Sequence, residues 1–336
     1  MKIAIHDSDL AFSKIWIEYC QNQNIPYKIV NCYKTDIIQQ ISDCDILMWH
    51  HNHNYANDKL FAKQLLFALQ QAGKKVFPDF NTGWHFDDKV GQKYLLEAIG
   101  APLVPSYVFY SKKEALEWAE STDYPKVFKL RAGAGSYNVS LAKNKSAAKY
   151  LIKRSFGRGF SPYNKYNNLK DTYMQFRRGK AQFFDVLKSL RRVFLSTRFA
   201  RVHGNEKGYA YFQNFIPNNT FDIRVIVIGN KAFAIKRMVR KDDFRASGSG
   251  TILYDKNLID ERCVQISFST TKKLNAQCVA YDFVFDQNNA PLIIEINYGF
   301  DRRGYLSCPG FWDETMKWHE QKFQPEEWML ELLIQS

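Results

Sequence analysis

The sequence predicts an α/β protein that opens with a parallel sheet of the doubly wound type. Over residues 1–85, short apolar runs alternate with helical stretches of about 10–17 residues, which is the pattern of strand–helix–strand units. We expect strands at 2–7, 27–33, 45–51 and 76–79, and helices at 12–24, 35–44 and 59–75. Thr35 is the expected N-cap of the second helix. With 336 residues and 46% apolar residues, the chain is long enough for two or three packed domains.

The sequence after the first strand argues against an ordinary dinucleotide site. A glycine-rich G-x-G-x-x-G turn normally follows that strand, and this chain has His-Asp-Ser-Asp there instead.

The middle of the chain is predicted to continue as helix, strand and hairpin. Residues 87–110 are typical of a helix that ends at Gly100, followed by an extended strand between prolines. Residues 124–144 indicate a strand, a glycine-containing loop and a second strand. Backbone N–H groups in such a loop can surround phosphate oxygens.

Hairpins are predicted in the last third. One spans 221–239 and turns at Gly229-Asn230, and another spans 279–300 and turns at Asn288-Asn289. We expect the tail from 311 to 336 to be helical, with Pro325 in the first turn of its last helix.

Positive charge is concentrated in one segment. The chain carries a net charge of +13, and residues 143–208 hold seventeen Lys or Arg against three Asp or Glu, a net of +14. This segment includes a predicted amphipathic helix, 181–196, with Lys188 and Arg192 opposite its apolar face and Arg191 as a further charge. The alternatives are a solvated surface, a nucleic-acid site, and a site for a polyanionic or lipid-diphosphate-linked molecule at a membrane surface.

Cysteine usage and the first residues indicate a cytoplasmic protein. The six cysteines form no C-x-x-C pair or zinc-ribbon spacing, so we expect free buried thiols in a reducing compartment. The first residues lack the apolar run of a signal peptide, and no apolar run approaches the ~18 residues that span a membrane.

Acidic and amide side chains interrupt the apolar strands of the last hairpin. Asp282 stands within Val-Ala-Tyr-Asp-Phe, and Glu295 and Asn297 lie two positions apart, hence on one face of a strand. Buried carboxylates must be paired, protonated or metal-bound. Their oxygens suit magnesium that carries nucleotide phosphates, and the alternative is a hydrogen-bonded core acid. Lys129, Lys236 and Arg237 are the cations expected to face phosphate oxygens.

In their order along the chain, these motifs resemble those of the ATP-grasp superfamily of carboxylate–amine ligases. The resemblance covers nearly all of the chain beyond residue 85. The resemblance implies an ATP-grasp fold after a Rossmann-like N-terminal domain, with boundaries at 1–85, 86–125, 126–215 and 216–336. The second range would be a linker helix and strand, the third a lid sub-domain with the basic insertion, and the fourth the sub-domain with the magnesium ligands.

The resemblance also assigns roles to individual residues. For the phosphates of ATP it implies Lys89, Lys129, Lys236 and Arg237, together with a glycine loop that contains Gly133, Gly135 and Ser136. For the nucleoside it implies an adenine-binding hinge at Gln213, Asn214 and Phe215 and a ribose-binding Asp222. It implies catalytic roles for Arg237, Arg245 and Ser247, and magnesium ligands Asp282, Glu295 and Asn297.

Two departures from the family pattern stand out. Lys129 is followed by Leu-Arg rather than the common proline, and Ala280 stands where some members place an acyl-phosphate-binding arginine; Arg245 is the expected substitute.

The implied activity is amide-bond formation between a carboxylate and an amine, with ATP and Mg²⁺ or Mn²⁺, through an acyl phosphate. The substrates would be small molecules, free or attached to a sugar or lipid diphosphate, and the tail resembles members from bacterial surface-polysaccharide clusters. The rival interpretations are an ATP-grasp kinase and a basic nucleic-acid-binding protein. Peripheral membrane contact and the oligomeric state, a homodimer among the alternatives, stay open.

Two further groups have open roles. His50, His51 and His53 follow the third predicted strand, where we favour surface or substrate-contact histidines over a metal site. Arg302 and Arg303 follow the predicted magnesium ligands, where a clamp on a substrate carboxylate and a solvated surface pair are equally good interpretations.

Overall fold

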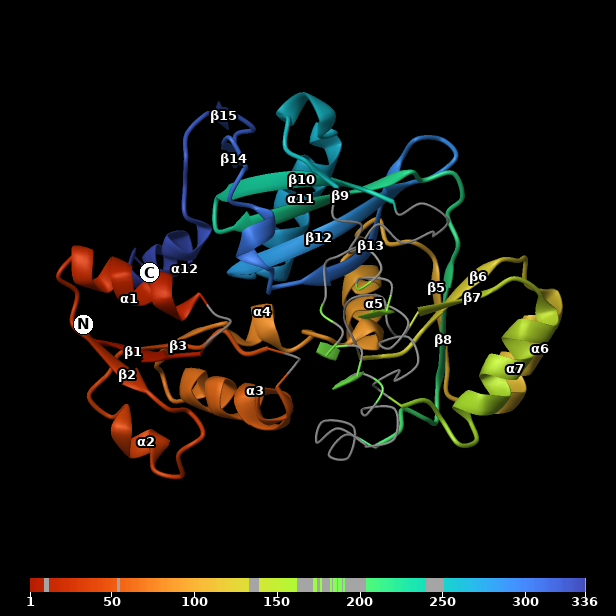
Figure 1. The fold of residues 1–336 in the computed structure, drawn as a ribbon, viewed down its shortest axis with the longest axis horizontal. Helices are drawn as coiled ribbons and strands as arrows, with labels where there is room; N and C mark the ends of the chain where they lie inside the picture. Colours follow the sequence, from red (N-terminus) through yellow and green to blue (C-terminus); the bar gives the residue numbers. More distant parts are fainter. Residues whose placement is uncertain are drawn as a thin grey trace. The chain divides into compact units, whose positions relative to one another are not determined.

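The computed structural model describes residues 1–8, 12–52, 55–132, 139–161, 204–239 and 251–335, with isolated positions between 172 and 190. The chain forms two compact units (Figure 1). Unit 1 contains Met1–Phe86, Tyr94–Leu103 and Ile216–Ser336, and unit 2 contains Asp87–Lys93 and Val104–Phe215.

Unit 1 begins with the predicted parallel sheet, which is confirmed. Its strands are β1 (Ile3–His6), β2 (Tyr27–Val30), β3 (Ile46–Met48) and β4 (Lys75–Phe77), all parallel and in the order β2-β1-β3-β4. Its helices are α1 (Ser13–Asn22), α2 (Ile37–Gln40), α3 (Ala56–Gln71) and α4 (Phe80–Gly83). Helix α2 is shorter than predicted, and Asp36 rather than Thr35 precedes it, so the expected Thr35 cap is wrong.

Alternate side chains of this sheet enter two different cores. Ile3 and Ile5 of β1 pack with α1 and with α12 (Pro325–Gln335), whereas Ala4 faces the core that α2 and α3 cover. Because side chains alternate along a strand, both faces must be apolar when both are covered.

The central sheet of unit 1 has seven strands in the order β13-β12-β9-β10-β14-β15, with β11 (Ile252–Leu253) also paired to β10. The predicted hairpins are confirmed. They are β9 (Phe221–Ile228) with β10 (Lys231–Met238), and β12 (Cys278–Phe285) with β13 (Pro291–Asn297). The turns contain Gly229 and Asn289, each with φ of +57°, a conformation that glycine and asparagine adopt readily.

The helical prediction for the tail is wrong over residues 311–324. Strands β14 (Phe311–Asp313) and β15 (Trp318–His319) form a small hairpin, and β14 pairs with β10. Thr315 and Lys317 donate backbone N–H groups to the Asp313 carboxylate, which favours a turn over a continuing helix. Only α12 is helical there, and Pro325 begins it as predicted.

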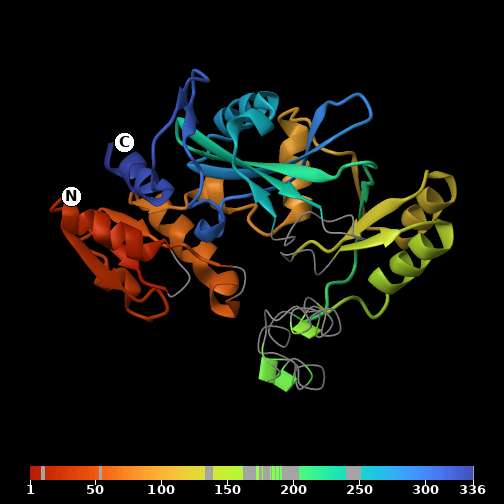
Figure 2. The ribbon, with the colours of Figure 1, turned by 45° about the horizontal axis from the view of Figure 1, so that its top comes forward.

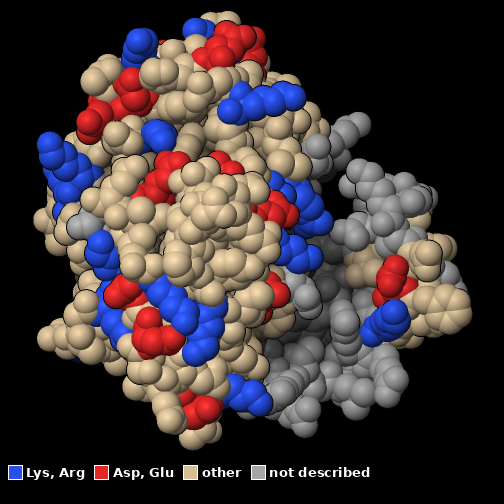
Figure 3. All heavy atoms as spheres, turned by 90° about the vertical axis from the view of Figure 1, so that its left-hand side faces the viewer, with Lys and Arg blue, Asp and Glu red and all other residues tan. Residues whose placement is uncertain are grey.

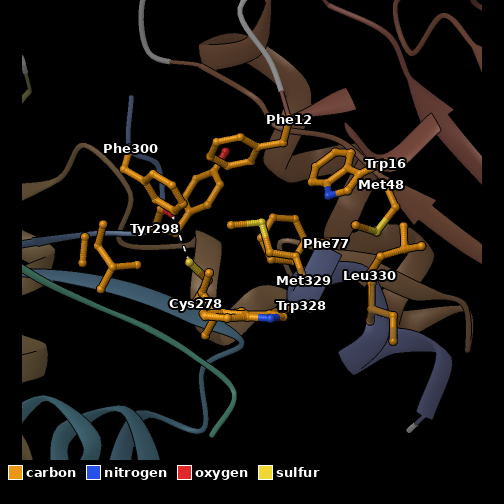
Figure 4. Packing of buried hydrophobic residues seen from close by; sticks show 14 of the residues in the cluster. Phe12, Trp16, Met48, Phe77, Cys278, Tyr298, Phe300, Trp328, Met329 and Leu330 are labelled. Atoms are coloured by element: carbon orange, nitrogen blue, oxygen red, sulfur yellow. Dashed lines mark hydrogen bonds between the residues drawn. The ribbon is translucent and has the colours of Figure 1, made fainter. Parts of the chain in front are cut away.

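Two apolar cores sandwich the central sheet. One face packs against α12 and the parallel sheet, where Phe12, Trp16 and Phe77 belong to the same cluster as Trp328 and Met329 (Figure 4). The other face is covered by α11 (Glu261–Leu274) and the end of α5 (Lys89–Ala98). Short 3₁₀ turns at Lys256–Leu258 and Arg302–Gly304 complete the described part of unit 1.

Unit 2 is an antiparallel sheet covered by helices on one face. The strands β5 (Ser106–Phe109), β6 (Lys126–Lys129), β7 (Val139–Ala142) and β8 (Ala210–Asn214) are ordered β5-β8-β6-β7. Helices α6 (Lys112–Ser121) and α7 (Lys145–Ser155) lie together on the face that carries Phe128 and Phe212 (Figure 2). Residues on the opposite face, such as Lys129 and Gln213, are thereby left out of this core.

All six cysteines are free and buried, as predicted. Burial raises the pKa of every one of these thiols, that of Cys20 to about 11 and that of Cys308 to about 12. On the face drawn in Figure 3, basic and acidic side chains are interspersed. Within the described parts of the chain, every helix is too short or too polar to cross a bilayer.

We expect Phe233 to be critical for the stability of unit 1. Its ring is fully buried and lies among those of Phe300, Tyr305, Phe323 and Trp328, so Phe233→Ala would leave a cavity. The free energy of unfolding, measured with urea, should fall by about 3–5 kcal/mol. The control Phe80→Ala removes a half-exposed ring and should cost much less; equal losses would contradict this account.

Candidate functional site

The central sheet is polar at one end of a face that is otherwise apolar. Ile226 and Ile228 of β9 enter the core beside α12, and Asp222 and Arg224 continue the same side of that strand. The strand register places Arg224 directly opposite Asp282 of β12, and Asp222 directly opposite Arg237 of β10. Four charged side chains from three adjacent strands therefore meet there.

These four side chains form a closed network of ion pairs. Arg224 Nη2 lies 2.6 Å from Asp282 Oδ2, and Arg224 Nε donates to the other oxygen of the same carboxylate. Arg237 binds Asp222 through two bonds of 2.7 and 2.6 Å, and its Nη2 also lies 3.0 Å from Asp282 Oδ1. Two carboxylates and two guanidiniums balance each other, as buried charges must.

The network keeps Asp282 ionised. Burial by itself would raise the pKa of this carboxyl, but the charges of Arg224 and Arg237, together with their hydrogen bonds, outweigh burial and lower the pKa far below its usual value. Asp282 is therefore a carboxylate at any physiological pH. This is the form that binds a cation.

The predicted magnesium ligands lie on two paired strands. Asp282 of β12 is directly opposite Glu295 of β13, and Ala280 is opposite Asn297, with an irregularity in the register just after Asp282. The side chain of Asn297 accepts the N–H of Gly299 at 3.0 Å. Two carboxylates and an amide oxygen suit Mg²⁺ chemically, so these residues fit the ion.

One feature of this ligand set was not expected. Both oxygens of Asp282 are bound by arginine, so a metal at Asp282 would have to compete with these guanidiniums. Among the described residues, no three His, Cys, Asp or Glu side chains form a metal-binding group, so the amide of Asn297 is a necessary part of the predicted set. The metal assignment stays a prediction.

The other predicted contacts in unit 1 also stay predictions. Asp222, assigned to the ribose, has both carboxylate oxygens bound to Arg237. Lys236, assigned to phosphate, has its ammonium 3.7 Å from the ring centre of Phe221. A cation over an aromatic face is attracted to the ring, which holds this side chain over Phe221 of the adjacent strand β9.

In unit 2, Lys129 is held by a chain of polar side chains. Its Nζ donates to Gln213 Oε1 at 2.6 Å, Gln213 Nε2 donates to Ser106 Oγ at 3.1 Å, and Ser106 Oγ donates to the Val104 carbonyl at 2.8 Å. Lys129 and Gln213 are both buried. The predicted phosphate lysine and the first residue of the predicted hinge are therefore in direct contact.

The structure also describes three other predicted residues of unit 2. Asn214 ends β8, accepts from Lys126 Nζ at 2.7 Å and donates its backbone N–H to the Pro105 carbonyl at 2.9 Å. Phe215 follows it and is half-buried. Lys89 is buried at the first position of α5.

Several predicted residues lie outside the part of the chain that the structure describes. They are Gly133, Gly135 and Ser136 of the predicted glycine loop, Arg245, Ser247, His53, and Arg191 and Arg192 of the predicted helix 181–196.

Of the two alternatives for these histidines, a surface position is wrong for His50 and His51, and a substrate contact stays a prediction. Both are buried, and the ring of His50 stacks on that of Phe12 at 3.8 Å. His51 lies against Phe86 and Tyr298. They follow the short strand β3, and the rings that enclose them come from segments distant in the sequence.

Arg302 and Arg303 each have an acidic partner. Arg303 pairs with Asp301 at 2.6 Å, and both side chains are exposed, as a solvated pair would be. Arg302 pairs at 3.2 Å with Glu326, whose side chain is fully buried. Burial raises the pKa of Glu326, and the charge of Arg302 opposes that rise.

Sequence reasoning missed Arg224. The resemblance predicts Arg245 as the acyl-phosphate arginine, which lies outside the described residues, whereas the structure brings Arg224 to Asp282 from the neighbouring strand. The signal that could have revealed Arg224 is its spacing of two residues from Asp222, which puts both side chains on the same face of one strand, the face toward Asp282.

Comparisons with known proteins bear on the fold and on one segment of the chain. Residues 201–305 match the RimK-like ATP-grasp domain, a segment that includes the four charged residues of the network. No curated protein is similar enough in sequence to be matched.

Solved structures resemble nearly the whole chain. D-cycloserine synthetase DcsG is 12% identical, with 99% of each chain covered and a TM-score of 0.60. The ATP-grasp ligase PsnB, in complex with its minimal precursor, Mg and ADP, is 11% identical over 99% of this chain and 97% of that one, with a TM-score of 0.55. A RimK domain ATP-grasp protein from Sphaerobacter thermophilus is 13% identical over 88% of this chain and 90% of that one, with a TM-score of 0.51. The chain therefore has the ATP-grasp fold, and its residues 201–305 match the RimK-like ATP-grasp domain.

Proposed function

We propose that this protein is an ATP-dependent ligase that joins a carboxylate to an amine through an acyl phosphate. The observation that carries the proposal is the polar end of the central sheet, where Asp282 and Glu295 lie beside Arg224 and Arg237 within the RimK-like domain. Carboxylates that hold a divalent cation next to fixed guanidiniums are the groups that phosphoryl transfer to an anionic acceptor requires.

The proposed reaction has two steps. The substrate carboxylate attacks the γ-phosphorus of ATP, the bond to the β-phosphate oxygen breaks, and ADP leaves. The amine then attacks the acyl carbon, the C–O bond to phosphate breaks, and the amine loses a proton to give the amide. Asp282, Glu295 and Asn297 would hold Mg²⁺, whose charge would neutralise the phosphate oxygens.

The side chains of this protein would bind and orient rather than react covalently. Lys89 and Lys129 would bind phosphate oxygens, and Arg224 and Arg237 would stabilise the negative charge on the acceptor side. None of the six thiols is a good nucleophile, because burial raises each pKa and keeps the thiol protonated. This fits a mechanism without an enzyme-bound intermediate.

The substrates we propose are an amino acid or a uronic acid of a bacterial surface polysaccharide and an amine, either of them free or linked to a sugar or lipid diphosphate. The resemblance of the tail to members from such clusters supports this choice. The net charge of +14 over residues 143–208 also favours an anionic substrate; half of that segment lies outside the described residues.

Trapping of the acyl phosphate tests the proposal. Purified protein would be incubated with ATP, Mg²⁺ and pairs of candidate acids and amines, and phosphate release would be measured. With the acid alone, hydroxylamine should yield a hydroxamate, and ¹⁸O in the acid's carboxylate should appear in the released phosphate. Stable phosphorylated acid that no amine consumes would indicate a kinase instead. Salt-sensitive binding of RNA without nucleotide turnover would favour the nucleic-acid interpretation.

Glu295→Gln should abolish turnover and leave the fold intact. Loss of one charged ligand should lower kcat by about 100-fold or more, a change of ~2.7 kcal/mol in the barrier. The same variant should lose Mn²⁺ binding, measured by electron paramagnetic resonance with ADP present. Glu320→Gln, at an exposed position, is the control and should behave as wild type. Full activity and full Mn²⁺ binding in Glu295→Gln would refute the metal assignment.

Lys129→Ala should weaken ATP binding by roughly 1.5–3 kcal/mol, the range for a hydrogen bond from a charged group. Isothermal titration calorimetry measures the dissociation constant, which should rise about 12- to 160-fold. Lys113→Ala removes the same charge from an exposed position on α6 and should leave the affinity unchanged. An unaltered affinity in a folded Lys129→Ala variant would rule out a contact between Lys129 and the phosphates.

A further inference from the structure

One aspartate both caps the helix that begins with Lys89 and binds a neighbouring strand. Asp88 Oδ1 accepts the N–H of Gly91 at 2.9 Å, and the Asp88 carbonyl accepts the N–H of Gln92 at 2.9 Å. Helix α5 thus begins at a side-chain cap, which satisfies one of its otherwise unpaired N–H groups.

The second oxygen of the same carboxylate binds Arg131. Arg131 Nη2 lies 2.5 Å from Asp88 Oδ2, and the Arg131 carbonyl accepts the N–H of Lys89 at 2.9 Å. Arg131 is two residues beyond Lys129, the last residue of β6. Main-chain and side-chain bonds together therefore join the start of α5 to the extension of β6.

A third segment holds Arg131 from the other side. Its N–H donates to the hydroxyl of Tyr209 at 2.6 Å, and that hydroxyl donates to Glu206 Oε2 at 2.8 Å. Burial raises the pKa of Tyr209 far above its usual value, so the hydroxyl keeps its proton and can accept and donate at once.

We propose that Arg131 is a positioning residue for nucleotide binding, which fixes Lys89 at the start of α5 relative to Lys129 on β6. The inference rests on the proposed function, because it assumes that both lysines bind ATP phosphates. Arg131 directly follows Leu130, which stands where the family commonly has proline. An affinity that depends on two lysines is sensitive to their separation, since a misplaced cation loses its hydrogen bond.

The stability of the fold should not depend on the Asp88–Arg131 pair. The Arg131 side chain is 57% exposed, and pairs of this kind contribute only ~0–1 kcal/mol to folding. Variants at this pair should therefore fold, so that an effect on nucleotide binding can be measured separately.

The sign of the effect in Asp88→Asn distinguishes positioning from simple electrostatics. The substitution keeps an oxygen that can cap α5 but removes a negative charge. If charge alone mattered, ATP would bind more tightly to this variant. If Asp88 positions Lys89 through Arg131, ATP should bind about 3- to 10-fold more weakly, and Arg131→Met should show a similar loss.

Unit 1 provides a control in which an aspartate that caps a helix pairs with an arginine of the same helix, two residues later. Asp260 caps α11, and its carboxylate binds Arg262 with an Nη2–Oδ2 distance of 2.6 Å. Asp260→Asn and Arg262→Met make the same chemical changes at another helix start. Neither should alter the affinity for ATP by more than about twofold.

A double-mutant cycle tests whether Arg131 acts through Lys89. ATP affinity would be measured by calorimetry for wild type, Arg131→Met, Lys89→Met and the double variant. If Arg131 acts through Lys89, Arg131→Met should cause less than a twofold change in the Lys89→Met background. Additive losses, tighter binding in Asp88→Asn, or wild-type affinity in both single variants would overturn the inference. A wild-type protein that fails to bind ATP would instead refute the proposed function.

Discussion

The pairing of four buried charges constrains the central sheet more than any other interaction. Arg224 and Asp282 face each other across β9 and β12, and Asp222 and Arg237 across β9 and β10. A shift of one residue in either register would turn these side chains to the opposite face and bury them without partners, which costs several kcal/mol per charge. The apolar parts of these strands would tolerate such a shift far better. The network that we place at the active site therefore also specifies the sheet that carries it.

Much of the fold could be predicted because its signals are local. The strand–helix alternation gave the parallel sheet, and the turns at Gly229 and Asn289 gave two hairpins. Helix α11 was missed, and the hairpin of β14 and β15 was predicted as helix. In that tail, aromatic residues occur at spacings that fit either structure, and the pairing of β14 with β10, some eighty residues earlier in the sequence, decides between them.

The candidate site was predictable as a set of residues but not as a set of contacts. Asp282 and Lys129 stood out because charged side chains interrupt apolar strands, and that signal needs no knowledge of neighbours. Their partners, Arg224 and Gln213, come from strands whose register the sequence does not reveal. The buried positions of His50 and His51 depend on rings from distant segments in the same way. Resemblance to a family could assign roles to residues. Only the pairing of strands shows which of their side chains form hydrogen bonds or ion pairs with one another.

The shared core beneath the parallel sheet has a consequence for how the chain folds during synthesis. Residues 1–86 contain all four strands of that sheet, yet one of its faces is completed by Trp328, Met329 and Leu330 of α12 (Figure 4). The ribosome adds roughly 5–20 residues per second, so this apolar face stays uncovered for about ten seconds or more after its strands have been made. During that interval it is a surface on which a chaperone, or another unfinished chain, can bind.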